Sequence, residues 1–205
     1  EPHEYQGAIG KVIDIHDTRL KLDVLEQLAT HDRMTGLLNH ASAKEQIIGR
    51  MAQKPDGAYA LVIFDLDHFK MANDTYGHIF GDQVLQHTAE KLRQSIRGMD
   101  IAARVGGDEF LVFLEYTEDL EPIIERIFRS LTGRFDEFDI SVSMGVARAD
   151  LVGMDYETLF HCADQALYTV KRAGRGHYRF YDESMSKMLS VISPIDEGGG
   201  EGAGG

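Results

Sequence analysis

Two strand-like stretches, DIAARV (100–105) and EFLVFLEY (109–116), are separated by only three residues, and two of those three are glycine. This spacing predicts a β-hairpin turned through Gly106 and Gly107, because glycine tolerates the positive φ angles of tight turns. The turn leads directly into Asp108 and Glu109, so two carboxyl groups stand at the start of an otherwise apolar strand. Any fold for this chain must bury that strand and leave its acidic end at the edge of a sheet.

A second strand carries acids at its opposite end. The run AYALVIFDLD (58–67) is apolar along most of its length, which is typical of a strand buried on both faces, and it ends with Asp65 and Asp67. If the two strands are antiparallel neighbours, both acidic ends lie at the same edge of the sheet. Asp65 and Asp67 then share a face for as long as the strand continues, because side chains alternate with a period of two.

Carboxylates gathered at one edge repel each other unless a cation lies among them or some of them stay protonated. Oxygen ligands favour Mg²⁺ or Mn²⁺ over zinc, and magnesium held by one or two carboxylates commonly takes its other ligands from water and substrate phosphates. The simpler alternative is an acidic strand end that faces solvent, beside a hairpin that only turns the chain.

Three basic residues accompany these acids. Lys70 follows Asp65 closely enough to reach a phosphate that such a metal would hold. Lys171 and Arg175 are four residues apart near the end of a predicted helix, so they can point the same way. Alternatively, this basic helix end only complements the helix dipole.

Asn73 and Asp82 form a further polar pair before a predicted helix. An amide both donates and accepts, and a carboxylate accepts N–H bonds from N1 and N2 of guanine, so the pair can recognise a guanine edge. Alternatively, Asp82 caps the helix that follows it. Spacing alone leaves both interpretations open.

Composition limits the class of protein. With 205 residues, 43% of them hydrophobic, the chain is large enough for one domain with a buried core. A net charge of −13 disfavours nucleic-acid binding, because phosphate backbones attract basic surfaces. Because Cys162 is the single cysteine, the chain cannot form an intramolecular disulfide. The sequence contains no run of about 18 apolar residues, so no membrane span is predicted. We expect a soluble, cytoplasmic segment without direct membrane contact.

The periodicity of apolar residues predicts an α/β (α+β) fold, in which helices cover a mixed, mainly antiparallel central sheet. Helices are predicted over 41–51, 82–96, 119–131 and 156–174, and further strands over 138–149 and 178–182.

Five segments resemble the motifs of GGDEF-domain diguanylate cyclases, in the order and at the spacing of that family. They are DRMTGLLNH (32–40), FDLDHFKMANDTYGHIFGD (64–82), RVGGDEF (104–110), SVSMGVA (141–147) and ADQALYTVKRAGR (163–175). Three residues depart from the family pattern, and they are Met34, His40 and Gly176, the last of which replaces the usual asparagine.

The resemblance implies a βαββαβ core, related to nucleotide cyclases and polymerase palms, that condenses two GTP molecules into cyclic di-GMP. It implies metal binding by Asp65 and Asp108 with the carbonyl of Leu66. Glu109 would bind a second metal or assist deprotonation of the attacking 3′-hydroxyl.

The resemblance also implies a set of substrate contacts. Backbone N–H groups of His68 and Phe69 would hold the β and γ phosphates together with three basic side chains, and Asn73 and Asp82 would read guanine. The three basic side chains are Lys70, Lys171 and Arg175. Gly106 and Gly107 would let the backbone approach the nucleotide closely.

Because each domain would hold one GTP, the resemblance implies catalysis by a homodimer whose two sites face each other. RGMD (97–100) stands at the spacing of the family's R-x-x-D product-inhibition site, so Arg97 and Asp100 would bind cyclic di-GMP. Arg126 is a candidate supporting contact. Alternatively, Arg97 and Asp100 only shape the turn before a strand.

We therefore expect four regions along the chain. They are a candidate end of a PAS-type sensor domain (1–16), a linker or signalling helix (17–30), the GGDEF catalytic domain (31–183) and a disordered, acidic, glycine-rich tail (184–205). The linker helix would pair with its copy in the dimer.

Three other functions compete with the cyclase, and the first of them, a purely structural dimerisation unit, would not need charged groups that face phosphates. A catalytically silent GGDEF module would bind GTP or cyclic di-GMP as a sensor, but such modules usually have a damaged signature, whereas Asp65, Lys70, Asp108 and Glu109 are all present. An enzyme that makes a mixed dinucleotide with adenine would change the guanine-reading acid, and Asp82 is intact.

Overall fold

The structure, a computed structural model of the chain, describes residues 25, 27–117 and 119–185. Its elements follow the chain as β1 (Leu38–Asn39), α2 (His40–Gln53), β2 (Tyr59–Leu66), α3 (Phe69–Tyr76), α4 (His78–Ser95), β3 (Ile101–Gly106), β4 (Glu109–Glu115), α5 (Leu120–Leu131), β5 (Gly133–Phe135), β6 (Phe138–Ile140), β7 (Val142–Arg148), α6 (Ala149–Val152), α7 (Tyr156–Arg172) and β8 (Tyr178–Phe180).

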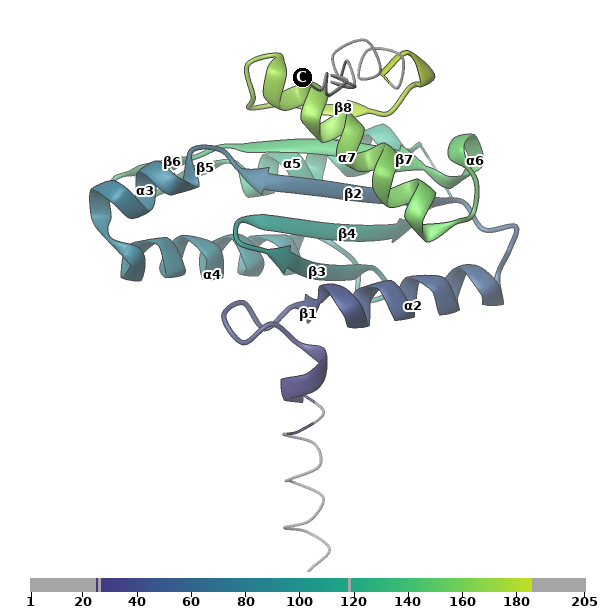
Figure 1. Cartoon of the computed structure of the whole chain (residues 1–205), viewed down its shortest axis with the longest axis horizontal. Coiled ribbons are helices and arrows are strands. Elements are labelled where there is room, and N and C mark those ends of the chain that lie inside the picture. Colours follow the sequence, from purple (N-terminus) through teal and green to yellow (C-terminus); the bar gives the residue numbers. More distant parts are fainter. Residues whose placement is uncertain (1–24, 26, 118, 186–205) are drawn as a thin grey trace, which may run out of the picture.

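Six strands form one sheet in the order β1-β3-β4-β2-β7-β8, and β5 with β6 forms a separate two-stranded sheet. The four inner strands of the large sheet are antiparallel to one another, whereas β1 and β8 pair in parallel at its two edges. The chain enters the inner strands as β2, α3–α4, β3, β4, α5, β7, which is the expected βαββαβ order (Figure 1). The predicted mixed, mainly antiparallel sheet is confirmed.

Helices cover both faces of this sheet. Along β2, Val62 and Phe64 belong to the core beneath α4 and α5, whereas Leu61 and Ile63 belong to the core beneath α2 and α7. All four side chains are at most 2% exposed. The apolar run that predicted a strand buried on both faces therefore forms one.

The predicted strand over 138–149 is interrupted. β6 ends at Ile140, β7 begins at Val142, and only β7 joins the large sheet. Ser141 leaves the ladder because its carbonyl accepts the N–H of Asp67 at 2.8 Å and its hydroxyl donates to the Asp67 carboxylate at 2.7 Å. A long-range contact thus overrides a continuous strand pattern.

The predicted start of the helix at 82 is also wrong. α4 begins at His78, and the short helix α3 precedes it with only Gly77 between them. No helix was predicted between residues 51 and 82, whereas in the structure Phe69, Ala72 and Phe80 pack in or against the core and hold both helices in place.

Parts of the predicted organisation lie outside the described residues. They are the candidate sensor-domain end (1–16), most of the linker helix (17–30) and nearly all of the tail (184–205). Residues 25 and 27–30 are helical, and Leu25 and Leu28 are exposed by 61% and 44%. Within the described part of the chain, no helix combines the length and the apolar character needed to cross a membrane.

The large sheet and α7 approach each other closely at Gly145 in β7. A Cβ atom at this position would lie 2.1 Å from the carbonyl oxygen of Ala163 and 2.3 Å from the backbone nitrogen of Leu167. We predict that Gly145→Ala lowers the free energy of unfolding by about 3 kcal/mol, because the backbone of α7 cannot rotate aside as a side chain can. Urea denaturation followed by circular dichroism measures the change.

Gly49→Ala in α2 is the matched control for this substitution. A Cβ atom at Gly49 meets nothing within 4 Å, so alanine should raise the free energy of unfolding by about 0.5–1 kcal/mol through its higher helix propensity. Equal stability of the two variants would contradict the explanation.

Candidate functional site

The acidic ends of β2 and β4 lie side by side where these two central strands end, and we call this row of strand ends the acidic edge. Asp65 pairs with Glu109 in the antiparallel ladder, and the N–H of Leu66 donates to the carbonyl of Asp108 at 3.4 Å. On its other side Asp65 pairs with Ser143 of β7, so it lies between two neighbouring strands. The structure therefore brings together acids from distant parts of the sequence.

Asp65 is largely buried among other charges. Its Oδ2 forms an ion pair with the Lys171 ammonium, whereas its Oδ1 is buried without a hydrogen-bond partner in the described part of the chain. Burial raises the pKa of the Asp65 carboxyl, Lys171 opposes the rise, and the nearby Asp108 and Asp67 carboxylates add to it. The protein therefore compensates this buried charge only in part.

Glu109 is half-buried beside Asp65. Burial raises the pKa of its carboxyl, Lys171 opposes the rise, and the charges of Asp65, Asp108 and Asp164 add to it. Asp164 lies on α7 and was missed by sequence reasoning, because an isolated acid on a helix gives no signal of what it faces. The acids together make this edge a region that attracts cations.

This edge suits a divalent cation that is shared with a substrate. The acids and the Leu66 carbonyl offer oxygen ligands, and the unpartnered Oδ1 of Asp65 is a buried acceptor whose charge a cation would neutralise. Among the described residues, no three histidine, cysteine, aspartate or glutamate side chains form a complete metal-binding group. The arrangement therefore fits Mg²⁺ or Mn²⁺ held by one or two carboxylates and by substrate oxygens.

Asp67 contributes to structure rather than to a metal site. It is only 4% exposed and accepts hydrogen bonds from the hydroxyls of Ser143 at 2.6 Å and Ser141 at 2.7 Å, and from the N–H of Gly176 at 3.0 Å. Both carboxylate oxygens are therefore satisfied. The side chain ties the end of β2 to β7 and to the segment before β8.

Two basic side chains approach the same edge from the end of α7. Lys171 lies in the last turn and contacts Asp65, while the Nε of Arg175 lies 4.0 Å from Asp67 Oδ1. Arg175 lies beyond the end of α7, which is Arg172, and has a left-handed backbone with φ 63°. Both side chains nevertheless reach the acids at the end of β2.

Gly176, which replaces the asparagine usual in the family, has a backbone conformation that both residues adopt readily. Its φ of 67° lies in the left-handed region, which glycine and asparagine adopt more readily than other residues. Its contact with Asp67 comes from the backbone N–H, so it does not depend on a side chain.

β2 continues into α3 through a sharp turn at His68. His68 has a left-handed backbone, with φ 60° and ψ 22°, and no side-chain hydrogen bond caps α3. Phe69 packs against the core at the start of the helix, whereas Lys70 is exposed. The first N–H groups of a helix lack intrahelical partners, so this helix start favours an anion.

Asn73 and Asp82 lie on adjacent helices, α3 and α4. The alternative that Asp82 caps its helix is wrong, because α4 begins earlier, at His78. The Asn73 side chain lies against Gly81, where a Cβ atom would be only 2.0 Å from Asn73 Oδ1. The structure therefore brings the amide beside the backbone that carries Asp82.

Gly107 and Asp108 form the tip of the β3–β4 hairpin. Gly107 has a positive φ of 55°, whereas Gly106 still belongs to β3 and keeps an ordinary φ. A Cβ atom added to either glycine would meet nothing within 4 Å. The protein therefore leaves space beside the tip.

Sequence reasoning missed the contact that fixes this tip. Arg104 donates hydrogen bonds to the carbonyl of Gly107 at 2.9 and 2.7 Å and to both oxygens of Asp32 at 3.2 and 3.3 Å. Burial raises the pKa of Asp32, but hydrogen bonds from Thr35 and Arg104 outweigh it and hold the pKa below its usual value. The sequence did contain a sign of this contact, because Asp32 and Arg104 are the first residues of two family-like motifs, DRMTGLLNH and RVGGDEF.

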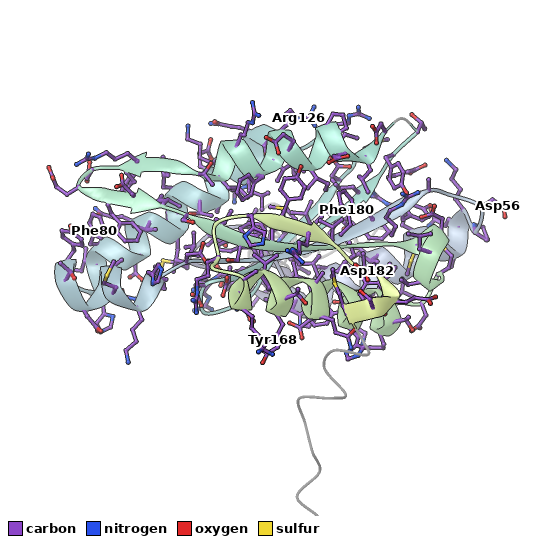
Figure 2. The ribbon with its side chains drawn as sticks, turned by 90° about the horizontal axis from the view of Figure 1, so that it is seen from above. Asp56, Phe80, Arg126, Tyr168, Phe180 and Asp182 are labelled. Atoms are coloured by element: carbon purple, nitrogen blue, oxygen red, sulfur yellow. The ribbon has the colours of Figure 1, made fainter. Side chains whose placement is uncertain are left out.

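Arg97 and Asp100 line a cavity of about 400 Å³, together with Arg50 and Arg93. One oxygen of Asp100 accepts the N–H of Arg97 at 2.7 Å, and the other is buried without a partner in the described ranges. Burial raises the pKa of Asp100, and the charges of Arg97, Arg50 and Arg126 oppose the rise. Arg126, on α5 (Figure 2), is not among the residues that line this cavity, although its charge acts on Asp100, whereas Arg50 and Arg93 do line it.

The sequence profile described as "Diguanylate cyclase, GGDEF domain" matches residues 29–177, which is well over half of the chain. The chain belongs to the GGDEF family. A solved GGDEF structure shares its fold. The coiled coil and GGDEF domain of DgcB from Caulobacter crescentus, in complex with c-di-GMP, gives a TM-score of 0.72 at 27% identity and covers 82% of this chain and 93% of that one.

Curated GGDEF relatives carry different names. Diguanylate cyclase DgcS from Shewanella oneidensis is 36% identical over 77% of this chain and 55% of DgcS. Cyclic di-GMP phosphodiesterase PdeR from Escherichia coli is 34% identical over 86% of this chain and 28% of PdeR. The chain spans 23–55% of the length of the first relatives that it matches.

The two aspartates at the end of β2 give opposite predictions for stability. Asp67→Asn should lower the free energy of unfolding by about 1–3 kcal/mol, because an amide cannot accept from all three donors. Asp65→Asn should raise it by about 1 kcal/mol in metal-free buffer, because it removes a buried carboxylate with an unpartnered oxygen. Urea denaturation with EDTA at pH 7 measures both, and equal destabilisation by the two variants would contradict the assigned roles.

Proposed function

We propose that the chain is a diguanylate cyclase that condenses two GTP molecules into cyclic di-GMP and releases two pyrophosphates. Membership of the GGDEF family and the similarity to DgcS support this proposal. The observation that carries it is the edge of the sheet where Asp65, Asp108 and Glu109 lie together, with Lys171 beside them.

In this proposal Asp65, Asp108, Glu109 and the carbonyl of Leu66 hold Mg²⁺ or Mn²⁺. A bound ion of this kind would neutralise the charge that develops on the α-phosphate when pyrophosphate leaves. Glu109 accepts the proton of the attacking 3′-hydroxyl, and the 3′-oxygen forms its bond to phosphorus as the bond to pyrophosphate breaks. The position of Glu109 supports this role, because it lies opposite Asp65 in the ladder, at the ends of the strands that carry the acids.

The β and γ phosphates are held by the positive groups around these acids. Lys171 and Arg175 reach the edge of the sheet from the end of α7, and Lys70 is exposed on the first turn of α3. The N–H groups of His68 and Phe69 add donors at the start of that helix. Fixing the phosphates in this way orients the α-phosphate for in-line attack.

Asn73 and Asp82 read the guanine base, and the hairpin glycines admit the nucleotide. The open space at Gly106 and Gly107 supports the second role, because no described atom lies within 4 Å of where a Cβ would be. A ligand can therefore approach the backbone closely at these glycines.

Because one domain holds one GTP, the enzyme acts as a homodimer in which two sites face each other. The exposed Leu25 and Leu28 support pairing through the linker helix, since they lie on its surface three residues apart. GTP is a cytoplasmic nucleotide, so we infer that the domain acts in the cytoplasm.

The cavity beside α2 and α4 serves as the product site. Arg97, Arg50 and Arg93 supply positive groups for the phosphates of cyclic di-GMP, and Asp100 offers a carboxylate oxygen that lacks a partner for guanine N–H groups. The cavity lies apart from the acidic edge, so the bound product inhibits from a second site.

The proposal predicts synthesis of cyclic di-GMP from GTP and Mg²⁺, identified by mass spectrometry. Glu109→Gln should lower the rate at least about 100-fold, because a proton acceptor is lost. The matched control is Glu115→Gln at the other end of β4, where the side chain pairs with Lys54, and it should keep the rate of the unsubstituted protein.

Three results would count against this assignment. A fully active Glu109→Gln variant would remove Glu109 from the reaction. Binding of GTP or cyclic di-GMP without turnover by the unsubstituted dimer would instead support a silent sensor module. A product that contains adenine, formed from mixed nucleotides, would contradict the assigned specificity.

Arg97→Ala should weaken inhibition by added cyclic di-GMP at least about tenfold while preserving synthesis, because a charged contact to the product is lost. The inhibition constant, measured at fixed GTP, reports the change. Arg129→Ala is the control, because Arg129 is exposed on α5 and pairs with Glu125. Unchanged inhibition of the Arg97 variant would remove this cavity as the product site.

A further inference from the structure

The small hairpin formed by β5 and β6 stands apart from the large sheet. Its strands contain three residues each, Gly133–Phe135 and Phe138–Ile140. An isolated two-stranded hairpin is only marginally stable in water, so this one depends on the surface against which it packs. That surface includes the corner between α3 and α4, and Phe138 and Ile140 of β6 also belong to the buried core beneath α4 and α5.

Aromatic rings join the hairpin to α4. The ring of Phe80 lies 5.8 Å from that of Phe135 and 6.3 Å from that of Phe138, between ring centroids. Phe135 also lies 4.7 Å from the ring of His87, two turns further along α4. Figure 2 shows Phe80 at the end of the molecule where the hairpin and the α3–α4 corner lie.

The same contacts extend to α3. The ring of Tyr76, the last residue of α3, lies 4.7 Å from that of Phe80, and its hydroxyl donates to the carbonyl of Glu137 at the hairpin turn at 3.5 Å. The hairpin therefore contacts both helices, one on each side of Gly77.

This corner carries Asn73 and Asp82, one on each helix. The two positions are coupled, because the Asn73 side chain lies against Gly81 with no room for a Cβ atom between them. A change in the angle between α3 and α4 therefore changes the distance between the amide and the carboxylate. Phe135 stacks on Phe80 and His87 of α4, so its effect on Asn73 and Asp82 would pass through the helices.

We propose that the β5–β6 hairpin is a brace that sets the spacing of the two base-reading side chains, with Phe135 as its main positioning residue. The inference rests on the proposed function, since it assigns a base to Asn73 and Asp82. Phe135 acts through Phe80 and His87 and does not itself touch the nucleotide. Nucleotide selectivity of this domain is then set partly by a surface hairpin outside the site.

The test compares GTP with ITP, which lacks the 2-amino group that Asp82 would bind. Phe135→Ala should raise KM for GTP about tenfold, leave kcat within about twofold, and bring the kcat/KM values of GTP and ITP closer together, because the carboxylate no longer meets the 2-amino group. Phe135→Tyr should restore the KM and the selectivity of the unsubstituted protein, since it keeps the ring.

Phe128→Ala is the matched control. Phe128 is a partly buried ring on α5 that packs on the same core and contacts Tyr178 at 5.5 Å, away from the α3–α4 corner. It should lower stability without changing the GTP-to-ITP ratio. If Phe135→Ala does not fold, Phe135→Leu provides the same measurement with the apolar volume largely kept.

Two outcomes overturn the inference in distinguishable ways. Unchanged selectivity in the Phe135 variants of an active protein, or an equal change in Phe128→Ala, would overturn the brace alone. Failure of the unsubstituted protein to bind or convert GTP would overturn the proposed function and the brace with it.

Discussion

The site depends on the register between β2 and β4. In this ladder Asp65 lies opposite Glu109, and a slip of one residue would turn one of these side chains to the opposite face of the sheet. Apolar packing fixes the register, as where the rings of Phe64 and Phe110 stack at 5.2 Å in the neighbouring pair. The core and the acidic edge are therefore specified by one arrangement of strands.

The sequence predicted those parts of the fold that arise from local pattern. The apolar run of β2 and the glycine turn before β4 identify two central strands, and helical periodicity identifies α2, α5 and α7. The break at Ser141 follows no local pattern, because it depends on hydrogen bonds to Asp67 from a distant strand. The two helices on either side of Gly77 likewise depend on packing against the core, which the local sequence pattern does not show.

The sequence predicted which residues lie at the candidate site better than it predicted what each of them does there. The period of two along a strand places Asp65 and Asp67 on the same face and does not distinguish them. In the structure the hydroxyls of Ser141 and Ser143 satisfy the Asp67 carboxylate, whereas one oxygen of Asp65 has no partner in the described part of the chain. Arg175 reaches the acids from a left-handed turn after α7, a backbone conformation that its spacing from Lys171 does not indicate. Each difference results from tertiary contacts that spacing alone cannot encode.

The guanidinium of Arg104 has a mechanical consequence. With four hydrogen bonds it ties Asp32, at the beginning of the folded body, to the hairpin tip next to Asp108. The hairpin tip therefore keeps its position relative to Asp32 only as long as these hydrogen bonds of one side chain persist. Replacing Arg104 would separate two parts of the chain, the start of the folded body and the acidic hairpin, that are 72 residues and more apart in the sequence.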